Sequence, residues 1–246
     1  VANGRLDAAV QQSSNLLTIA ATVGQRSYQA ESAAFRADLL ERAGQPEQAI
    51  AAYQENLADG IPVEHQRLAL LKITALYMAK TNLVSATKTL EGLLAQHTNA
   101  PTADLALLTL GELRLRQAES APLPRTTPIV STNALPSTNS IDLALAALQS
   151  FTNRFPQSPL LGKAQLALGR YFLLVDRVAE SEQAFRAAVQ GLPPSFEQAT
   201  AYFKLGDVQF QQRAYGGALA SYSAVVEKFA SLPEVRANLL ESALYQ

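Results

Sequence analysis

Residues 202–222 read YFKLGDVQFQQRAYGGALASY, and this stretch decides the fold. Apolar residues recur there at the three- and four-residue spacing of a helix face, first over 202–210 and again over 218–226. Between the two runs, residues 213–217 (RAYGG) interrupt the spacing. The stretch therefore predicts two amphipathic helices joined by a tight turn.

A small residue recurs in this pattern at an interval of 37 residues. Gly169 and Gly206, each preceded by leucine, lie 37 residues apart, and Gly111 also follows a leucine. Two steps of 37 residues back from Gly111 reach Thr74 and Ala37, which are also small. In four units a second small residue follows 12 positions later, at 37 and 49, 74 and 86, 169 and 181, and 206 and 218. A fixed period of this size predicts a stack of repeats, each packed only on its neighbours.

The repeated unit is similar to the tetratricopeptide repeat (TPR), whose signature is W-x2-L-G-x2-Y, then A-x3-F, then P. The matching residues are Tyr202-x2-Leu205-Gly206 with Ala218-x3-Tyr222, and Leu168-Gly169-x2-Phe172 with Ser181-x3-Phe185 and Pro193. The resemblance covers nearly the whole chain. It implies an all-α, right-handed α-solenoid of antiparallel helix pairs, with about five repeats and a half-repeat at either end.

The expected organisation is one TPR-like domain over 1–246, part of a longer array. Residues 5–19 resemble a second helix without its first, and 233–246 a first helix without its second. Residues 118–140 hold four prolines and eight Ser/Thr, a composition that predicts an insertion loop. The loop is either a tolerated, solvated insertion or a partner-binding arm with Ile129-Val130 as its apolar anchor.

Composition argues against several classes of function. The net charge is −1, from 20 basic and 21 acidic residues, whereas a nucleic-acid-binding surface normally needs a basic stripe. The chain has no uninterrupted apolar run long enough to span a membrane. It also has no cysteine, which excludes disulfides and thiolate metal sites. We therefore expect no nucleic-acid partner and no membrane span.

Catalytic and metal-binding patterns are absent as well. The sequence has no G-x-S-x-G, no phosphate-binding P-loop and no G-x-G-x-x-G. Its two histidines, His65 and His97, are 32 positions apart, and neither has a second ligand one helical turn away. Acidic pairs such as Asp38 with Glu41 are more typical of a solvated helix face than of general acid–base chemistry. The sequence predicts no enzyme activity, no cofactor and no metal.

The TPR resemblance implies that first helices line a concave groove, and it assigns the ligand-facing positions of those helices. The partner-binding residues expected from these positions are Leu108, Glu112, Leu115, Arg116, Lys163, Leu166, Arg170, Leu173, Phe203, Asp207, Phe210 and Gln211. The chaperone-binding members of the family hold a carboxylate with lysines and an asparagine. No asparagine occupies the matching position here, so that clamp is absent. Either the apolar residues form a groove for a partner helix, or they pack helix against helix.

The predicted function is a non-enzymatic scaffold that binds a protein or peptide partner in the groove. The alternative is a structural spacer or assembly element within a larger protein or complex. The junction Phe155-Pro156-x-Ser158 resembles bacterial envelope members of the superfamily, the outer-membrane assembly lipoproteins and cell-division coordinators. It suggests a periplasmic or outer-membrane-associated location.

Overall fold

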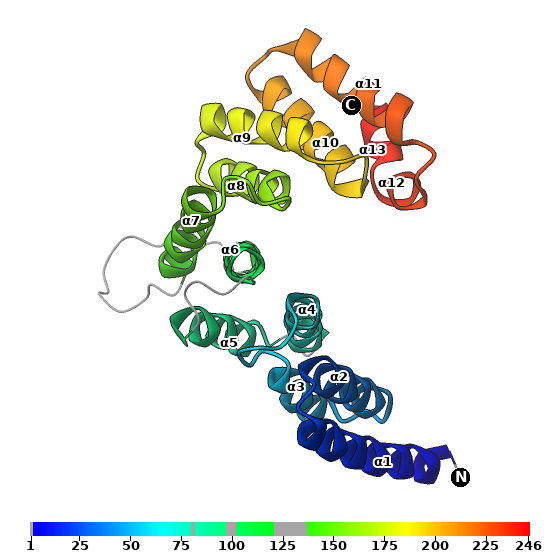
Figure 1. The fold of residues 1–246 in the computed structure, drawn as a ribbon. Coiled ribbons are helices and arrows are strands. Elements are labelled where there is room, and N and C mark those ends of the chain that lie inside the picture. Colours follow the sequence, from blue (N-terminus) through cyan, green and yellow to red (C-terminus); the bar gives the residue numbers. More distant parts are fainter. Residues whose placement is uncertain (1, 80–81, 97–101, 121–136) are drawn as a thin grey trace, which may run out of the picture. The chain divides into compact units, whose positions relative to one another are not determined.

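The computed structural model is all-helical over the residues that it describes, 2–79, 82–96, 102–120 and 137–246. In these ranges the chain forms thirteen helices and no strand (Figure 1). The helices are α1 (Ala2–Val23), α2 (Arg26–Arg42), α3 (Pro46–Glu55), α4 (Val63–Ala79), α5 (Leu83–Gln96), α6 (Ala103–Ser120), α7 (Ser137–Arg154), α8 (Leu161–Leu174), α9 (Val178–Gly191), α10 (Phe196–Gln211), α11 (Tyr215–Phe229), α12 (Pro233–Asn238) and α13 (Leu240–Tyr245).

The helices form the predicted antiparallel pairs, so the all-α repeat architecture is confirmed. Four of the pairs are α2–α3, α4–α5, α8–α9 and α10–α11. The fifth is α6–α7, in which Leu148 of α7 packs against Gly111 of α6. Helix α1 includes the whole of 5–19 and packs on α2, as an unpaired second helix should. The chain divides into two compact units, residues 1–106 and 107–246, which are described separately below. The single TPR-like domain over 1–246 stays a prediction.

The small residue recurs because each pair packs in the same way. A Cβ atom added at Gly169 would lie 2.5 Å from the ring of Phe185, and one added at Gly206 would lie 2.6 Å from the ring of Tyr222. Real Cβ atoms essentially never come that close to a neighbour, so the ring needs a glycine beneath it. The small residue of the first helix in a pair thus packs directly against the large residue of the second helix.

The turn inside the pairs also repeats. Gly44, Asp176 and Arg213 have positive φ, and each lies seven residues after the small residue of its first helix. The next residue's N–H donates to the carbonyl five residues back, as in Arg177 to Phe172 at 2.8 Å and Ala214 to Gln209 at 2.8 Å. This is the Schellman motif, which ends the first helix and reverses the direction of the chain before the second helix begins.

The structure differs from expectation in 233–246, which forms two short helices, α12 and α13, rather than one. The break is at Leu239, whose φ of −125° ends the first helix. Leu239 and Ala243 thereby pack against the core of α10 and α11, together with Val235. Burial of these side chains explains why the helix is interrupted.

The predicted insertion 118–140 is helical at both of its ends, since α6 continues to Ser120 and α7 begins at Ser137. Residues 121–136, including Ile129-Val130, lie outside the described residues, and so does His97. No helix in the described ranges is both long enough and apolar enough to cross a membrane.

Candidate functional site

The predicted site lies in the second unit, on the side of α6, α8 and α10 that carries the twelve predicted residues. We call this side the first-helix face. Two ion pairs join the three helices there. Arg170 on α8 donates from one guanidinium nitrogen to both carboxylate oxygens of Glu119 on α6, at 2.7 Å each. Lys163 on α8 donates to Glu197 on α10 at 2.8 Å. The two ion pairs therefore connect α6 to α8 and α8 to α10, which follow one another in this order in Figure 1.

These ion pairs contribute more to arrangement than to stability. All four side chains are between a third and a half exposed, and exposed pairs typically stabilise a fold by less than about 1 kcal/mol. Their effect is to occupy Lys163 and Arg170 with intramolecular partners. Lys163 also lowers the pKa of the Glu197 carboxyl through its hydrogen bond.

Glu112 is the carboxylate of the face that has no hydrogen-bond partner within the described residues. Burial raises the pKa of Glu112, while the nearby charges of Lys163 and Arg170 act in the opposite direction. Desolvation outweighs the attraction, so the charged form of Glu112 is disfavoured where it lies.

Asp207 is also engaged inside the unit. It accepts a hydrogen bond from the hydroxyl of Tyr222 at 2.8 Å and another from Lys204 at 2.9 Å. Burial raises the pKa of Tyr222, and the hydrogen bond to Asp207 raises it further. Asp207 thus connects α10 to α11 and is not a free charge on the first-helix face.

The predicted apolar residues divide by exposure. Leu108, Leu115 and Phe203 are buried, with exposed fractions of 3%, 0% and 9%. Leu166 and Leu173 are half-buried and pack against the core around Phe185. Helix-to-helix packing, the alternative given for these residues, accounts for the burial of the first three.

Four side chains in the C-terminal halves of the first helices are exposed and not engaged in an ion pair within the described residues. Phe210 is 50% exposed and makes an edge contact with Tyr215, their ring centroids 5.4 Å apart. Leu174 is 41% exposed, and Arg116 and Gln211 are also exposed. No hydrogen bond or ion pair occupies Arg116 within the described residues. Arg116, Phe210 and Gln211 from the predicted set, together with Leu174, are therefore exposed and available to a partner.

Sequence reasoning missed Glu119 and Glu197, the intramolecular partners of two predicted binding residues. Glu197 lies 34 positions after Lys163, close to one repeat period, so the repeat register could have indicated that pair. Glu119 and Arg170 are separated by 51 positions because the irregular unit lies between them. No local signal connects that pair.

Metal ligation has no obvious site in the part of the chain that the structure describes. No group of three or more His, Asp or Glu side chains is placed there to hold an ion. His65, at the start of α4, has no such companions in the described residues.

Comparison with known proteins supports the repeat assignment. Residues 137–196 and 197–233 match the family model for the tetratricopeptide repeat. A search of curated proteins found no match.

Solved structures of TPR proteins share this helical-repeat fold over most of the chain. TTC0263, a thermophilic TPR protein from Thermus thermophilus, is 14% identical, with a TM-score of 0.60 over 88% of this chain and 100% of that one. MamA from Desulfovibrio magneticus RS-1 is 15% identical, with a TM-score of 0.56 over 83% and 97%. YrrB, described as a TPR protein with an unusual peptide-binding site, is 17% identical, with a TM-score of 0.54 over 93% and 96%. At these identities the likeness concerns the fold alone, and what YrrB binds is a property of YrrB.

Proposed function

Since the chain carries tetratricopeptide repeats, we propose that it is a non-enzymatic interaction scaffold whose first-helix face binds a peptide or helical segment of a partner protein. TPR folds are typical of protein–protein interaction scaffolds. The partner would lie across the C-terminal halves of α6, α8 and α10. Phe210 and Leu174 would supply apolar contacts, and Arg116 and Gln211 would set register and specificity.

The observation that supports this proposal is the contrast between paired and unpaired side chains on one face. Lys163, Arg170 and Asp207 are occupied inside the unit, whereas Arg116 has no partner within the described residues and Phe210 is half exposed. An exposed aromatic ring and an available guanidinium on one face are the residue types enriched at interface hot spots. The available cation favours a partner segment that carries an acidic residue next to its apolar anchors.

Two other predictions belong with this proposal. A periplasmic or outer-membrane-associated location stays a proposal from the sequence resemblance of the junction Phe155-Pro156-x-Ser158, which lies between α7 and α8. The structural spacer is the alternative function, and the experiment below separates it from a binding scaffold.

The test is selection from a displayed peptide library on the full chain, followed by measurement of the selected peptides on variants. Phe210→Asp and Arg116→Glu should each weaken binding about tenfold or more, because each removes a hot-spot contact. The control is Leu219→Asp, which changes a 68% exposed leucine on the second helix α11 and should leave binding unchanged. Phe203→Ala is a poor choice, because its buried ring packs 5.5 Å from that of Tyr222.

Two outcomes contradict the first-helix face as the site, and a third contradicts the scaffold itself. Peptides that bind all three variants equally would place the contact elsewhere. Peptides that depend on Leu219 would move the site to the second helices. No enrichment above a folded, non-binding protein would favour the spacer.

A further inference from the structure

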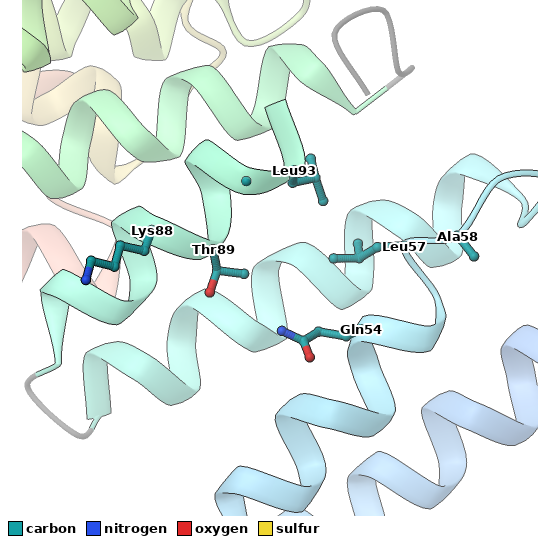
Figure 2. A pocket seen from close by; sticks show the side chains of 7 residues that line it. Gln54, Leu57, Ala58, Lys88, Thr89 and Leu93 are labelled. Carbon is teal, nitrogen blue, oxygen red and sulfur yellow. The ribbon is translucent and has the colours of Figure 1, made fainter. Parts of the chain in front are cut away.

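A pocket opens in the first unit, on the second-helix side of the repeats, between α5 and the end of α3 (Figure 2). Its volume is about 370 Å³, near the lower end of the range for small-molecule sites. The described residues that line it are Gln54, Leu57, Ala58, Lys88, Thr89, Gly92 and Leu93. None of them belongs to the first-helix face.

Gly92 is the feature that sets this pocket apart from an ordinary gap between helices. A glycine inside a helix costs about 1 kcal/mol relative to alanine. At Gly169 and Gly206 that cost accompanies a ring packed against the backbone, but a Cβ added at Gly92 would meet nothing within 4 Å. Packing within the described residues therefore gives no reason for a glycine here, and its missing side chain leaves space in the wall of the pocket.

The chemistry of the lining is apolar at the back and cationic at the edge. Leu57 and the largely buried Leu93 supply apolar surface, and Gln54 and Thr89 face each other across the opening in Figure 2. The Thr89 hydroxyl donates to the carbonyl of Ser85 at 3.0 Å.

Lys88 gives the pocket its charge. It is exposed, and within the described residues its ammonium group has no hydrogen bond or ion pair. No acidic side chain is among the described lining residues. The pocket is therefore complementary to a small ligand with an apolar body and one negative charge.

We propose that this pocket binds a short aliphatic carboxylate. The hydrocarbon chain lies against Leu57 and Leu93 in the space that Gly92 leaves. The carboxylate lies at the edge beside Gln54, whose amide can donate a hydrogen bond, while Lys88, which extends away from the other labelled side chains in Figure 2, contributes positive charge at longer range. This proposal is independent of the one for the first-helix face, since it uses other residues in the other unit.

The experiment is a titration of the full chain followed by NMR, with the Gly92 amide and the methyl groups of Leu57 and Leu93 as reporters. The ligands are hexanoate, the neutral hexanol and the cationic hexylamine. We expect hexanoate to shift the reporters at the lowest concentration and hexylamine at the highest. Equal affinities for hexanoate and hexanol would overturn the proposal, because the charge would then play no part. A fourth ligand, N-acetylnorleucine, imitates the C-terminal residue of a peptide. If it binds more tightly than hexanoate, the site suits a peptide C-terminus and the proposal of a free aliphatic acid is overturned.

Two variants and a control complete the test. Gly92→Leu should abolish the shifts while the melting temperature stays at or above that of the wild type. If it melts lower, Gly92→Ala replaces it and should weaken hexanoate binding. Lys88→Gln should weaken hexanoate by roughly two- to fivefold, the range for an exposed ion pair, and leave hexanol unchanged. Lys228→Gln, which changes an exposed lysine on α11 outside the pocket, should change neither. Hexanoate binding unaffected by Gly92→Leu would refute the site.

Discussion

Helices α8 and α5 each contain an interior glycine, and the two glycines have opposite surroundings. Gly169 lies beneath the fully buried ring of Phe185, so close that a Cβ would stand 2.5 Å from it. Gly92 has open space around the same position. Both glycines weaken their helices by a similar amount. Only at Gly169 is the cost offset by packing against a neighbouring helix, so the residue type alone does not reveal which role a helical glycine has.

The repeat register separates the two roles. Gly169 and Gly206 occupy the small position of the first helix, 37 residues apart, whereas Gly92 lies in a second helix and six residues beyond its small residue, Ala86. A glycine in register serves the packing of its pair. Gly162 and Gly191 are out of register and still pack closely against each other, whereas Gly92 has no close neighbour, and a pocket is the explanation that the structure offers for Gly92.

The largest effect is expected from filling an in-register glycine. Gly206→Leu forces a side chain into the ring of Tyr222 and should lower the free energy of unfolding by about 1–3 kcal/mol or more. Chemical denaturation of the full chain measures this. Gly216→Leu is the matched control, since a Cβ at Gly216 meets nothing within 4 Å. Equal losses for the two variants would show that close packing is not what selects the glycine at 206.

Much of the fold could be predicted from the sequence, because close packing between helices imposes a regular spacing on the residues that make it. Glycine recurs at 169 and 206 because each position receives a ring from its own second helix, 16 residues later. The break at Leu239 could not be predicted, since it depends on how Leu239 and Ala243 fit a core assembled from α10 and α11. A helical pattern in 233–246 is equally compatible with one helix or two.

The site was less predictable than the fold. Register placed Arg116 and Phe210 on an accessible surface, but it placed Phe203 in the same set, and Phe203 is buried. The distinction depends on how deeply neighbouring helices interlock, which the period does not record. Nor could the sequence show that Arg170 is occupied by Glu119, because the irregular unit separates them in the chain.

A smaller effect is expected from removing the hydroxyl group of Tyr222, whose ring packs against Gly206. Tyr222→Phe removes a partly buried hydrogen bond to Asp207 and should lower the free energy of unfolding by about 1 kcal/mol at neutral pH. Burial and Asp207 raise the pKa of Tyr222 above its ordinary value of about 10. The folded state therefore holds this proton more tightly than the unfolded state does, and stability falls as the pH rises above about 10.

The difference between wild type and Tyr222→Phe should consequently be constant below pH 10 and shrink above it. Denaturation curves for both proteins across that range measure the change. Tyr28→Phe, at a 52% exposed tyrosine on α2, is the control and should show no such convergence. If the difference in the free energy of unfolding instead stays constant up to strongly alkaline pH, then folding does not raise the pKa of Tyr222.

The smallest effect has the opposite sign and tests the other side of the comparison. Gly92→Ala should raise the free energy of unfolding by about 0.5–1 kcal/mol, because alanine favours the helix and the added methyl group meets no neighbour. Gly169→Ala, the same substitution in α8, should instead be destabilising, since Phe185 has to move. If the two substitutions change the free energy of unfolding with opposite signs, then Gly169 stabilises the fold and Gly92 is present although it destabilises its helix. If Gly92→Ala also destabilises, then Gly92 has a packing role and no longer indicates a binding pocket.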